Sequence, residues 1–354
     1  MTEHELVLEP QPVPSPKRGL LKVLIRVVVG VGVLGFLLVK ADVGQLWDTL
    51  REARIAYLLA ALGSIFAGLL VSAFRWKAYL DALEIPLRYG TLFRLYFVGT
   101  FFNAFLPTGI GGDAYKAVRL GKDREGSLAP AFASVFLDRF AGVVGMAAIG
   151  LVSSAYLLAS GDARRRVPLI ALALSVAIIG AAAILLVGGE RLLGRGRLVK
   201  HEGIGGRVRR AMRSIHEAAR HPDAAARGYV FGVVFQLLVL GYHLSVAKAL
   251  RLDGIPILAF ACIVVAASLA TMIPLSINGL GFREGAYIWA LGQYLIPLVG
   301  KDRSHDVALA YALLILAMLL LSSLAGGIVY VLLGGEVHRP GRGHSAVGSA
   351  PSSP

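Results

Sequence analysis

Long stretches without a charged residue dominate the chain. Six such runs, each 20 to 29 residues long, cover 55–74, 140–161, 167–189, 228–247, 254–282 and 307–335. A helix needs about 20 apolar residues to cross the roughly 30 Å of hydrocarbon in a bilayer. A surface helix of a soluble protein would carry a polar stripe, and these runs carry none. The pattern therefore predicts an all-α polytopic membrane protein.

Around these runs we predict six full membrane spans and two polar tails. The spans cover about 20–39, 55–74, 128–158, 167–187, 228–247 and 307–333. The first span follows a proline-rich tail, residues 1–19, and is predicted to be an uncleaved signal-anchor helix. Residues 20–335 then form one membrane domain. Residues 336–354, rich in Gly, Ser and Pro, are predicted to be disordered.

Two further apolar regions are interrupted by proline and glycine. The residues that break them are Pro107, Gly109, Gly111 and Gly112 in the first region, and Pro274, Gly279 and Gly281 in the second. Proline lacks an N–H group and glycine loosens the backbone, so a straight helix through either region is disfavoured. Irregular backbone survives in a membrane only where protein or a water-filled cavity satisfies it. We predict two broken or re-entrant helical elements; ordinary loops between spans are the alternative.

The two breaks resemble each other. Both contain Pro-x-x-Ile-x-Gly, and an acidic and a basic residue follow each one. Interrupted segments in corresponding halves of a chain are typical of transporters with an inverted repeat. The loop at 188–227 has ten Lys/Arg against four Asp/Glu, which predicts a cytoplasmic location. In this topology both termini are cytoplasmic, and the two breaks enter the membrane from opposite faces. The three arginines at 164–166 then lie on the external side, which conflicts with the usual cytoplasmic location of basic residues.

Composition narrows the function. The net charge is +14, but the basic residues lie in short loops between apolar runs, so we expect no nucleic-acid partner. Cys262 is the single cysteine, which excludes an intrachain disulfide or a cysteine-based metal cluster. No His-Glu-x-x-His motif and no phosphate-binding Walker loop occur. We therefore expect no metal, no cofactor and no ATP-driven pump.

Ionisable and polar residues near membrane depth are the candidate site, because burying them is costly. The candidates for contact with a lipid headgroup are Asn103, Asp113, Lys116, Arg119, Asp138, Arg139, Ser276, Asn278, Arg283 and Glu284. Lys116 and Arg119 share a helical face and could hold a phosphate. Adjacent helical residues point about 100° apart, so Asp138 and Arg139 need separate partners. Helix caps, plain ion pairs and interfacial charges are the alternatives.

Two structural expectations follow from these candidates. Arg139 should face a protein cavity and not lipid, because an unpaired guanidinium in hydrocarbon is too costly. The two breaks should approach each other near the bilayer midplane and line one shared cavity, with Asn103 and Asn278 satisfying freed backbone groups.

Three other features have simpler interpretations. Arg75 and Trp76 are interpreted as interfacial anchors at the end of the second span. His243 is interpreted as a hydrogen-bonded core residue. Gly228 and Gly232 are expected to allow close helix packing.

Several of these short motifs together resemble a known family. They are Arg-Trp at 75–76, Phe-Phe-Asn-Ala-Phe-Leu-Pro at 101–107, Gly-Gly-Asp at 111–113, Leu-Asp-Arg at 137–139, Pro-Leu-Ser at 274–276, Gly-Leu-Gly at 279–281 and Arg-Glu-Gly at 283–285. The pattern is similar to the flippase-like transmembrane domain of lysylphosphatidylglycerol synthases, and covers about 20–335. In bifunctional members this domain moves aminoacylated phosphatidylglycerol between leaflets, and a separate soluble domain attaches the amino acid. Stand-alone relatives are linked to varied lipids, including hopanoids and polyprenyl-linked sugars.

The resemblance implies lipid handling in the cell inner (plasma) membrane. Because the chain ends shortly after the last span, we expect no aminoacyl-transfer activity. The expected function is a flippase-like translocase that moves a polar or anionic lipid between leaflets without ATP hydrolysis. The alternative is an enzyme, or an accessory or scaffold subunit, of envelope lipid or glycolipid biosynthesis. The expected partners are membrane lipids and, in the alternative, lipid-biosynthesis enzymes.

Overall fold

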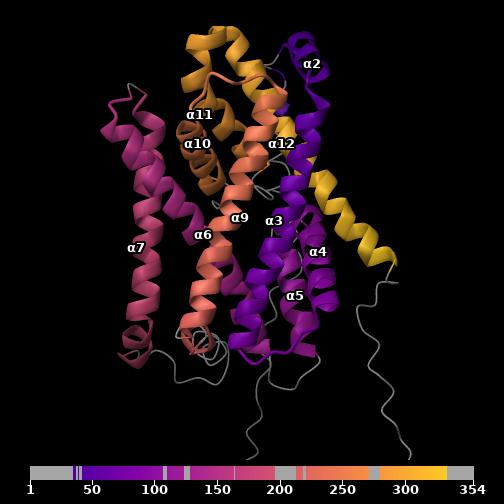
Figure 1. The fold of residues 1–354 in the computed structure, drawn as a ribbon, viewed down its shortest axis with the longest axis vertical. Helices are drawn as coiled ribbons and strands as arrows, with labels where there is room; N and C mark the ends of the chain where they lie inside the picture. Colours follow the sequence, from indigo (N-terminus) through magenta and orange to yellow (C-terminus); the bar gives the residue numbers. More distant parts are fainter. Residues whose placement is uncertain are drawn as a thin grey trace, which may run out of the picture.

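The computed structural model describes residues 42–106, 110–122, 128–162, 164–195, 213–217, 221–270 and 280–332, together with 35–36 and 39. Within these ranges the long elements are all helices (Figure 1). They are α2 Val43–Arg51, α3 Ile55–Ala82, α4 Tyr89–Phe105, α5 Gly111–Lys122, α6 Leu128–Ala159, α7 Arg166–Arg195, α9 Pro222–Ala249, α10 Ile257–Ala270, α11 Phe282–Val299 and α12 Lys301–Leu332. The predicted all-α polytopic membrane class is confirmed.

Five helices in the described part of the chain are long and apolar enough to cross a bilayer. They are Ile55–Ala82, Leu128–Ala159, Arg166–Ile184, Pro222–Ala249 and Arg303–Leu332. These are five of the six predicted spans; the sixth, at 20–39, lies almost entirely outside the described residues. Helix α3 continues beyond its predicted end at residue 74, because Arg75 is buried among neighbouring helices and does not meet the membrane surface.

The two predicted broken elements are pairs of short helices. Helices α4 and α5, of 17 and 12 residues, pack against each other in the lower half of Figure 1. Helices α10 and α11, of 14 and 18 residues, pack against each other in the upper half. Each helix is shorter than the roughly 20 residues that a full crossing needs. Two helical hairpins therefore occupy opposite halves of the bundle.

The largest apolar core is built by α9, α10, α11 and α12 together with residues of α3, α6 and α7. His243 lies inside it, with Nδ1 2.6 Å from the Tyr311 hydroxyl and Nε2 3.3 Å from the Tyr287 hydroxyl. Tyr242 stacks on the imidazole, with ring centroids 4.1 Å apart. The prediction that His243 is a hydrogen-bonded core residue is confirmed.

Glycine allows the helices to approach closely at several places. A Cβ atom at Gly232 would lie 3.0 Å from the Ala141 carbonyl oxygen, and one at Gly228 would overlap the Tyr79 hydroxyl. The predicted packing role of these two glycines on α9 is confirmed. On α12, a Cβ atom at Gly326 would overlap the Phe97 carbonyl oxygen of α4. Backbone contact between α4 and α12 therefore requires glycine at this position.

We expect Gly326→Ala to destabilise the protein by about 1–3 kcal/mol, because the added methyl group forces α4 away from α12. Thermal unfolding of the purified protein in detergent measures this change. Gly292→Ala on α11 is the matched control, since a Cβ atom there meets no atom within 4 Å. Equal melting temperatures for the two variants would contradict the packing described here.

Candidate functional site

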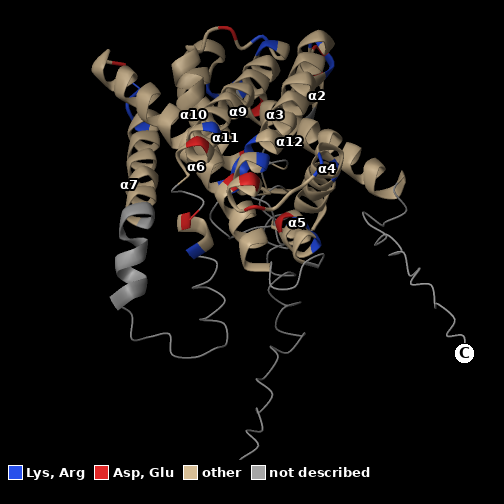
Figure 2. Ribbon diagram, turned by 60° about the horizontal axis from the view of Figure 1, so that its bottom comes forward, with Lys and Arg blue, Asp and Glu red and all other residues tan. Residues whose placement is uncertain are grey.

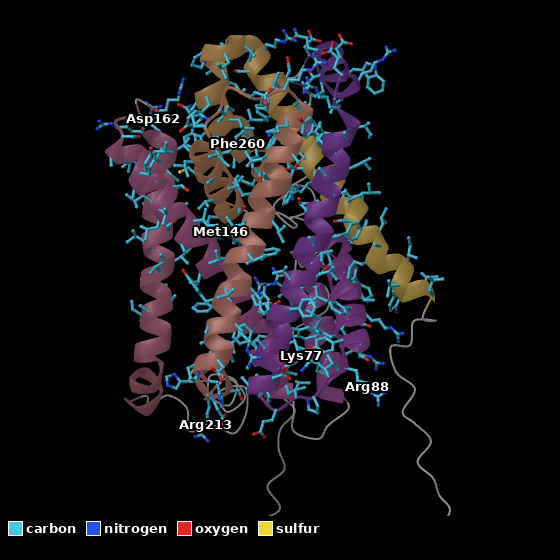
Figure 3. The ribbon with its side chains drawn as sticks, viewed as in Figure 1. Lys77, Arg88, Met146, Asp162, Arg213 and Phe260 are labelled. Carbon is cyan, nitrogen blue, oxygen red and sulfur yellow. The ribbon has the colours of Figure 1, made fainter. Side chains whose placement is uncertain are left out.

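A cavity of about 250 Å³ lies between α3, α4, α5, α6 and α9. Its charged lining residues are Arg75, Asp113, Lys116, Asp138 and Arg139. Figure 2 shows basic and acidic residues side by side inside the helix bundle, away from its ends. Met146 also lines the cavity and lies near mid-height in Figure 3. A polar cavity therefore extends to the depth of the membrane-spanning helices.

The Asp138 carboxylate is the centre of this cavity's charge network. Its side chain is 2% exposed and accepts a hydrogen bond from Arg75 Nε at 2.8 Å. The Tyr96 hydroxyl donates to the other oxygen at 3.1 Å, and Lys116 Nζ lies 3.9 Å from that oxygen. These partners come from α3, α4 and α5. One carboxylate of α6 therefore interacts with side chains of three other helices.

The Lys116 ammonium group is enclosed by carboxylates and rings. It lies 3.3 Å from Asp113 Oδ1, 4.9 Å from the ring centroid of Trp76 and 4.5 Å from that of Tyr96. Aromatic faces attract cations because their ring quadrupole is negative above the plane. These contacts hold the buried charge of Lys116 in one place beside the cavity.

Arg139 occupies the open side of the cavity. Its guanidinium contacts the Asp113 carboxylate, and its side chain is 49% exposed. The prediction that Arg139 faces a protein cavity is confirmed, because it is among the cavity-lining residues. Asp138 and Arg139 have separate partners, as their helical spacing predicts.

The first hairpin is closed by side-chain and backbone contacts. Asn103 Oδ1 accepts from the Gly112 backbone N–H at 2.8 Å, which confirms the predicted role of Asn103. A Cβ atom at Gly112 would overlap the Gly99 carbonyl oxygen, so α4 and α5 touch through their backbones. Gly111 begins α5, and Asp113 lies in its first turn, where the helix dipole favours a negative charge.

The remaining candidates lie elsewhere or are not described. Arg119 on α5 is not among the cavity-lining residues, so Lys116 and Arg119 do not assemble a phosphate site there. At the start of α11, Glu284 accepts from Arg283 Nη2 at 2.8 Å and from the Gly281 N–H at 2.6 Å. Gly281 has φ 80°, a conformation that favours glycine.

The pair Arg283–Glu284 does not line the described cavity either. Pro107, Gly109, Pro274, Ser276, Asn278 and Gly279 lie outside the described residues. The approach of Gly109 to Asn278, and the shared cavity between the breaks, stay predictions.

Arg75 and Trp76 were the residues that sequence reasoning misplaced. Arg75 is 3% exposed and Trp76 is fully buried, with its indole N–H donating to Ser134 Oγ at 3.2 Å. The interpretation of both as interfacial anchors is wrong, because α3 continues past them inside the bundle. The sequence does contain a signal for this pairing: Arg75 and Asp138 have opposite charges, and each lies within an otherwise apolar helix. Tyr96 and Gln236 also line the cavity, and no motif indicated them.

A bundle of membrane-spanning helices with a buried charged cavity beside a broken hairpin defines a polytopic membrane protein with an internal polar site. The chain belongs to the lysylphosphatidylglycerol synthase TM region family, which it matches over residues 23–327. It is also similar to a UPF0104 membrane protein of Methanothermobacter thermautotrophicus, with 28% identity over 284 residues. That alignment covers 75% of this chain and 83% of the relative. The family match includes every residue of the cavity.

We expect Asp138→Asn to destabilise the protein by about 3–5 kcal/mol, because it leaves Arg75 and Lys116 without their shared counter-charge in a buried site. Unfolding in detergent measures the change. Asp81→Asn is the control: Asp81 pairs with Lys77 on the surface, where an ion pair contributes about 0–1 kcal/mol. A loss for Asp138→Asn no larger than that for Asp81→Asn would show that the buried network does not stabilise the fold.

Proposed function

We propose that this protein is a flippase-like lipid translocase that moves a polar or anionic lipid between leaflets without ATP hydrolysis. One observation carries the proposal: a charged cavity lies inside the helix bundle, beside a hairpin whose helices are too short to cross the bilayer. Membership of a family named for lysylphosphatidylglycerol supports a lipid as the substrate.

The physical problem for such a protein is the lipid headgroup. A charged or polar group in hydrocarbon loses its hydration and costs several kcal/mol or more. The cavity offers fixed charges in place of water, held by the contacts among Arg75, Lys116 and Asp138. The headgroup would occupy this cavity while the acyl chains stay in the bilayer.

The positions of the two hairpins suggest how a path for the lipid headgroup could extend from the cavity across the membrane. The α4–α5 hairpin lies in one half of the bundle and the α10–α11 hairpin in the other (Figure 1). In transporters with inverted repeats, such discontinuous elements meet at the midplane and expose the site alternately to each side. We propose that the segments around Pro107 and Pro274 meet there and complete the path.

We propose that the protein lies in the cell inner membrane. In the proposed orientation, the basic loop at 188–227 and both termini face the cytoplasm. Arg213 lies at the lower end of the bundle with Lys77 and Arg88, and Asp162 lies at the upper end (Figure 3). Lys/Arg residues concentrate in short cytoplasmic loops, and this tendency supports a cytoplasmic location of the lower end.

Single cysteines test this orientation. In a Cys262→Ala background, Asp162→Cys should react with a membrane-impermeant maleimide in intact cells. Arg213→Cys should react only after permeabilisation, because its side chain would face the cytoplasm. The background protein without a cysteine is the control for non-specific labelling. Labelling of Arg213→Cys from outside would overturn the orientation.

Lipid transfer itself is tested in proteoliposomes with labelled lipids of different headgroups. We expect Lys116→Gln and Arg139→Gln each to lower the transfer rate about 10- to 100-fold, because each removes a charge-assisted contact of about 1.5–3 kcal/mol. Arg88→Gln is the control, since Arg88 precedes α4 and does not line the cavity.

Absence of transfer for every lipid offered would overturn the translocase proposal. The accessory or scaffold role in lipid or glycolipid biosynthesis would then take its place.

A further inference from the structure

A second cavity lies at the other end of the helix bundle. It has a volume of about 560 Å³, and its walls are α2, the end of α9 and the turn from α11 to α12. Helix α2 lies at the upper end in Figure 1, whereas α4 and α5, which border the charged cavity, lie in the lower half. The volume is within the roughly 300–1,000 Å³ that small-molecule sites occupy. This cavity is therefore large enough to hold a ligand of its own.

Four charged side chains line this second cavity, and their charges cancel. Asp48 on α2 and Glu52 at its end are four residues apart, so they share one face of the helix. Arg251 follows α9, and Arg303 lies in the first turn of α12. All four are exposed, and no ion pair joins any two of these four described residues. Two negative and two positive groups on different elements thus stay accessible to a ligand.

Arg251 occupies a backbone position that glycine usually takes. Its φ is 58°, in the left-handed region. The Arg251 N–H donates to the Lys248 carbonyl at 3.1 Å, and the Leu252 N–H donates to the Ala247 carbonyl at 2.9 Å. These are the two bonds of the Schellman motif that ends a helix, in which glycine avoids the strain of a Cβ atom. Arginine is the less favourable residue for ending α9, so its side chain indicates a role beyond helix termination.

Arg303 is also unfavourably placed for its own helix. The N-terminus of a helix carries a partial positive charge, which repels a cation in the first turn. A carboxylate bound in the cavity would offset this charge, and guanidinium groups bind carboxylates with two parallel hydrogen bonds. The apolar part of the lining comes from Leu250, Leu252, Val299 and Val307. The cavity therefore suits a ligand with an anionic end, a cationic end and an apolar part.

We propose that this cavity binds a short zwitterionic peptide. Its terminal ammonium group contacts Asp48 and Glu52, its terminal carboxylate contacts Arg251 and Arg303, and an apolar side chain packs on the aliphatic lining. The carboxylates and guanidinium groups of the cavity do not pair with each other, so the charges of the ligand must be separated, as those of a peptide are and those of a single amino acid are not. The exposure of all four groups favours a water-soluble ligand over a lipid.

This inference does not depend on the proposed lipid transfer, because the two cavities share no described lining residue. It gives the protein a second ligand site, at the end of the bundle that the proposed orientation places outside the cytoplasm.

Calorimetry on the full-length protein in a non-ionic detergent, with leucyl-leucine as the probe, tests the inference. The N-acetyl derivative lacks the ammonium group and the amide derivative lacks the carboxylate. Each should bind about 10-fold more weakly or less, because each loses a charge-assisted contact. Equal affinity for the three, or no binding of leucyl-leucine, would overturn the inference. Dihexanoyl phosphatidylethanolamine that binds as tightly as leucyl-leucine would overturn the assignment to a peptide.

Two variants separate ligand contact from folding. Arg251→Gly removes a guanidinium group but suits the left-handed backbone, so it should weaken leucyl-leucine binding about 10-fold while the melting temperature is retained or raised. Glu52→Gln should weaken leucyl-leucine binding by a similar factor and leave the affinity for the N-acetyl derivative unchanged. Wild-type affinity for leucyl-leucine in both variants would refute the contacts.

Lys248→Gln is the matched control. Lys248 lies in the last turn of α9, three residues from Arg251, and is exposed but not among the described lining residues. It should bind leucyl-leucine like the wild type. A loss as large as that of Arg251→Gly would show a general effect of surface charge and overturn the site.

Discussion

The buried carboxylate of Asp138 is the interaction on which the lower half of this bundle depends. Helix α6 would otherwise carry an isolated negative charge at membrane depth, which is unfavourable. The bond to Arg75 fixes α3, the bond to Tyr96 fixes α4, and the charge of Lys116 fixes α5. One charge network holds these four helices together, and the cavity is the space between them and α9.

Both hairpins solve the problem of a helix that begins inside a membrane by the same kind of contact. The first N–H groups of a helix have no partner within it. Asn103 accepts one of these at Gly112 in the first hairpin, and Glu284 accepts the N–H of Gly281 in the second. Asn103 lies on α4, before the break, whereas Glu284 lies in the first turn of α11, after the break. The Glu284 carboxylate is paired with the adjacent Arg283, whose Nη2 lies 2.8 Å from it.

The spans and the broken elements could be predicted from the sequence because hydrocarbon thickness and backbone satisfaction act on local stretches of chain. The separate partners of Asp138 and Arg139, and the bond made by Asn103, followed from helical geometry in the same way. The burial of Arg75 could not be predicted, since it depends on how α6 and α9 pack against α3. The exclusion of Arg119 from the cavity likewise depends on the rotation of α5, which spacing along one helix does not determine.

Helix α12 packs against α4 of the first hairpin and against α11 of the second. At Gly326 its backbone touches that of α4, with no side chain between them to yield. Protein interiors transmit strain because they are close-packed. Helix α12 thus couples the two hairpins physically: a displacement of either one would strain the packing of α12 against the other.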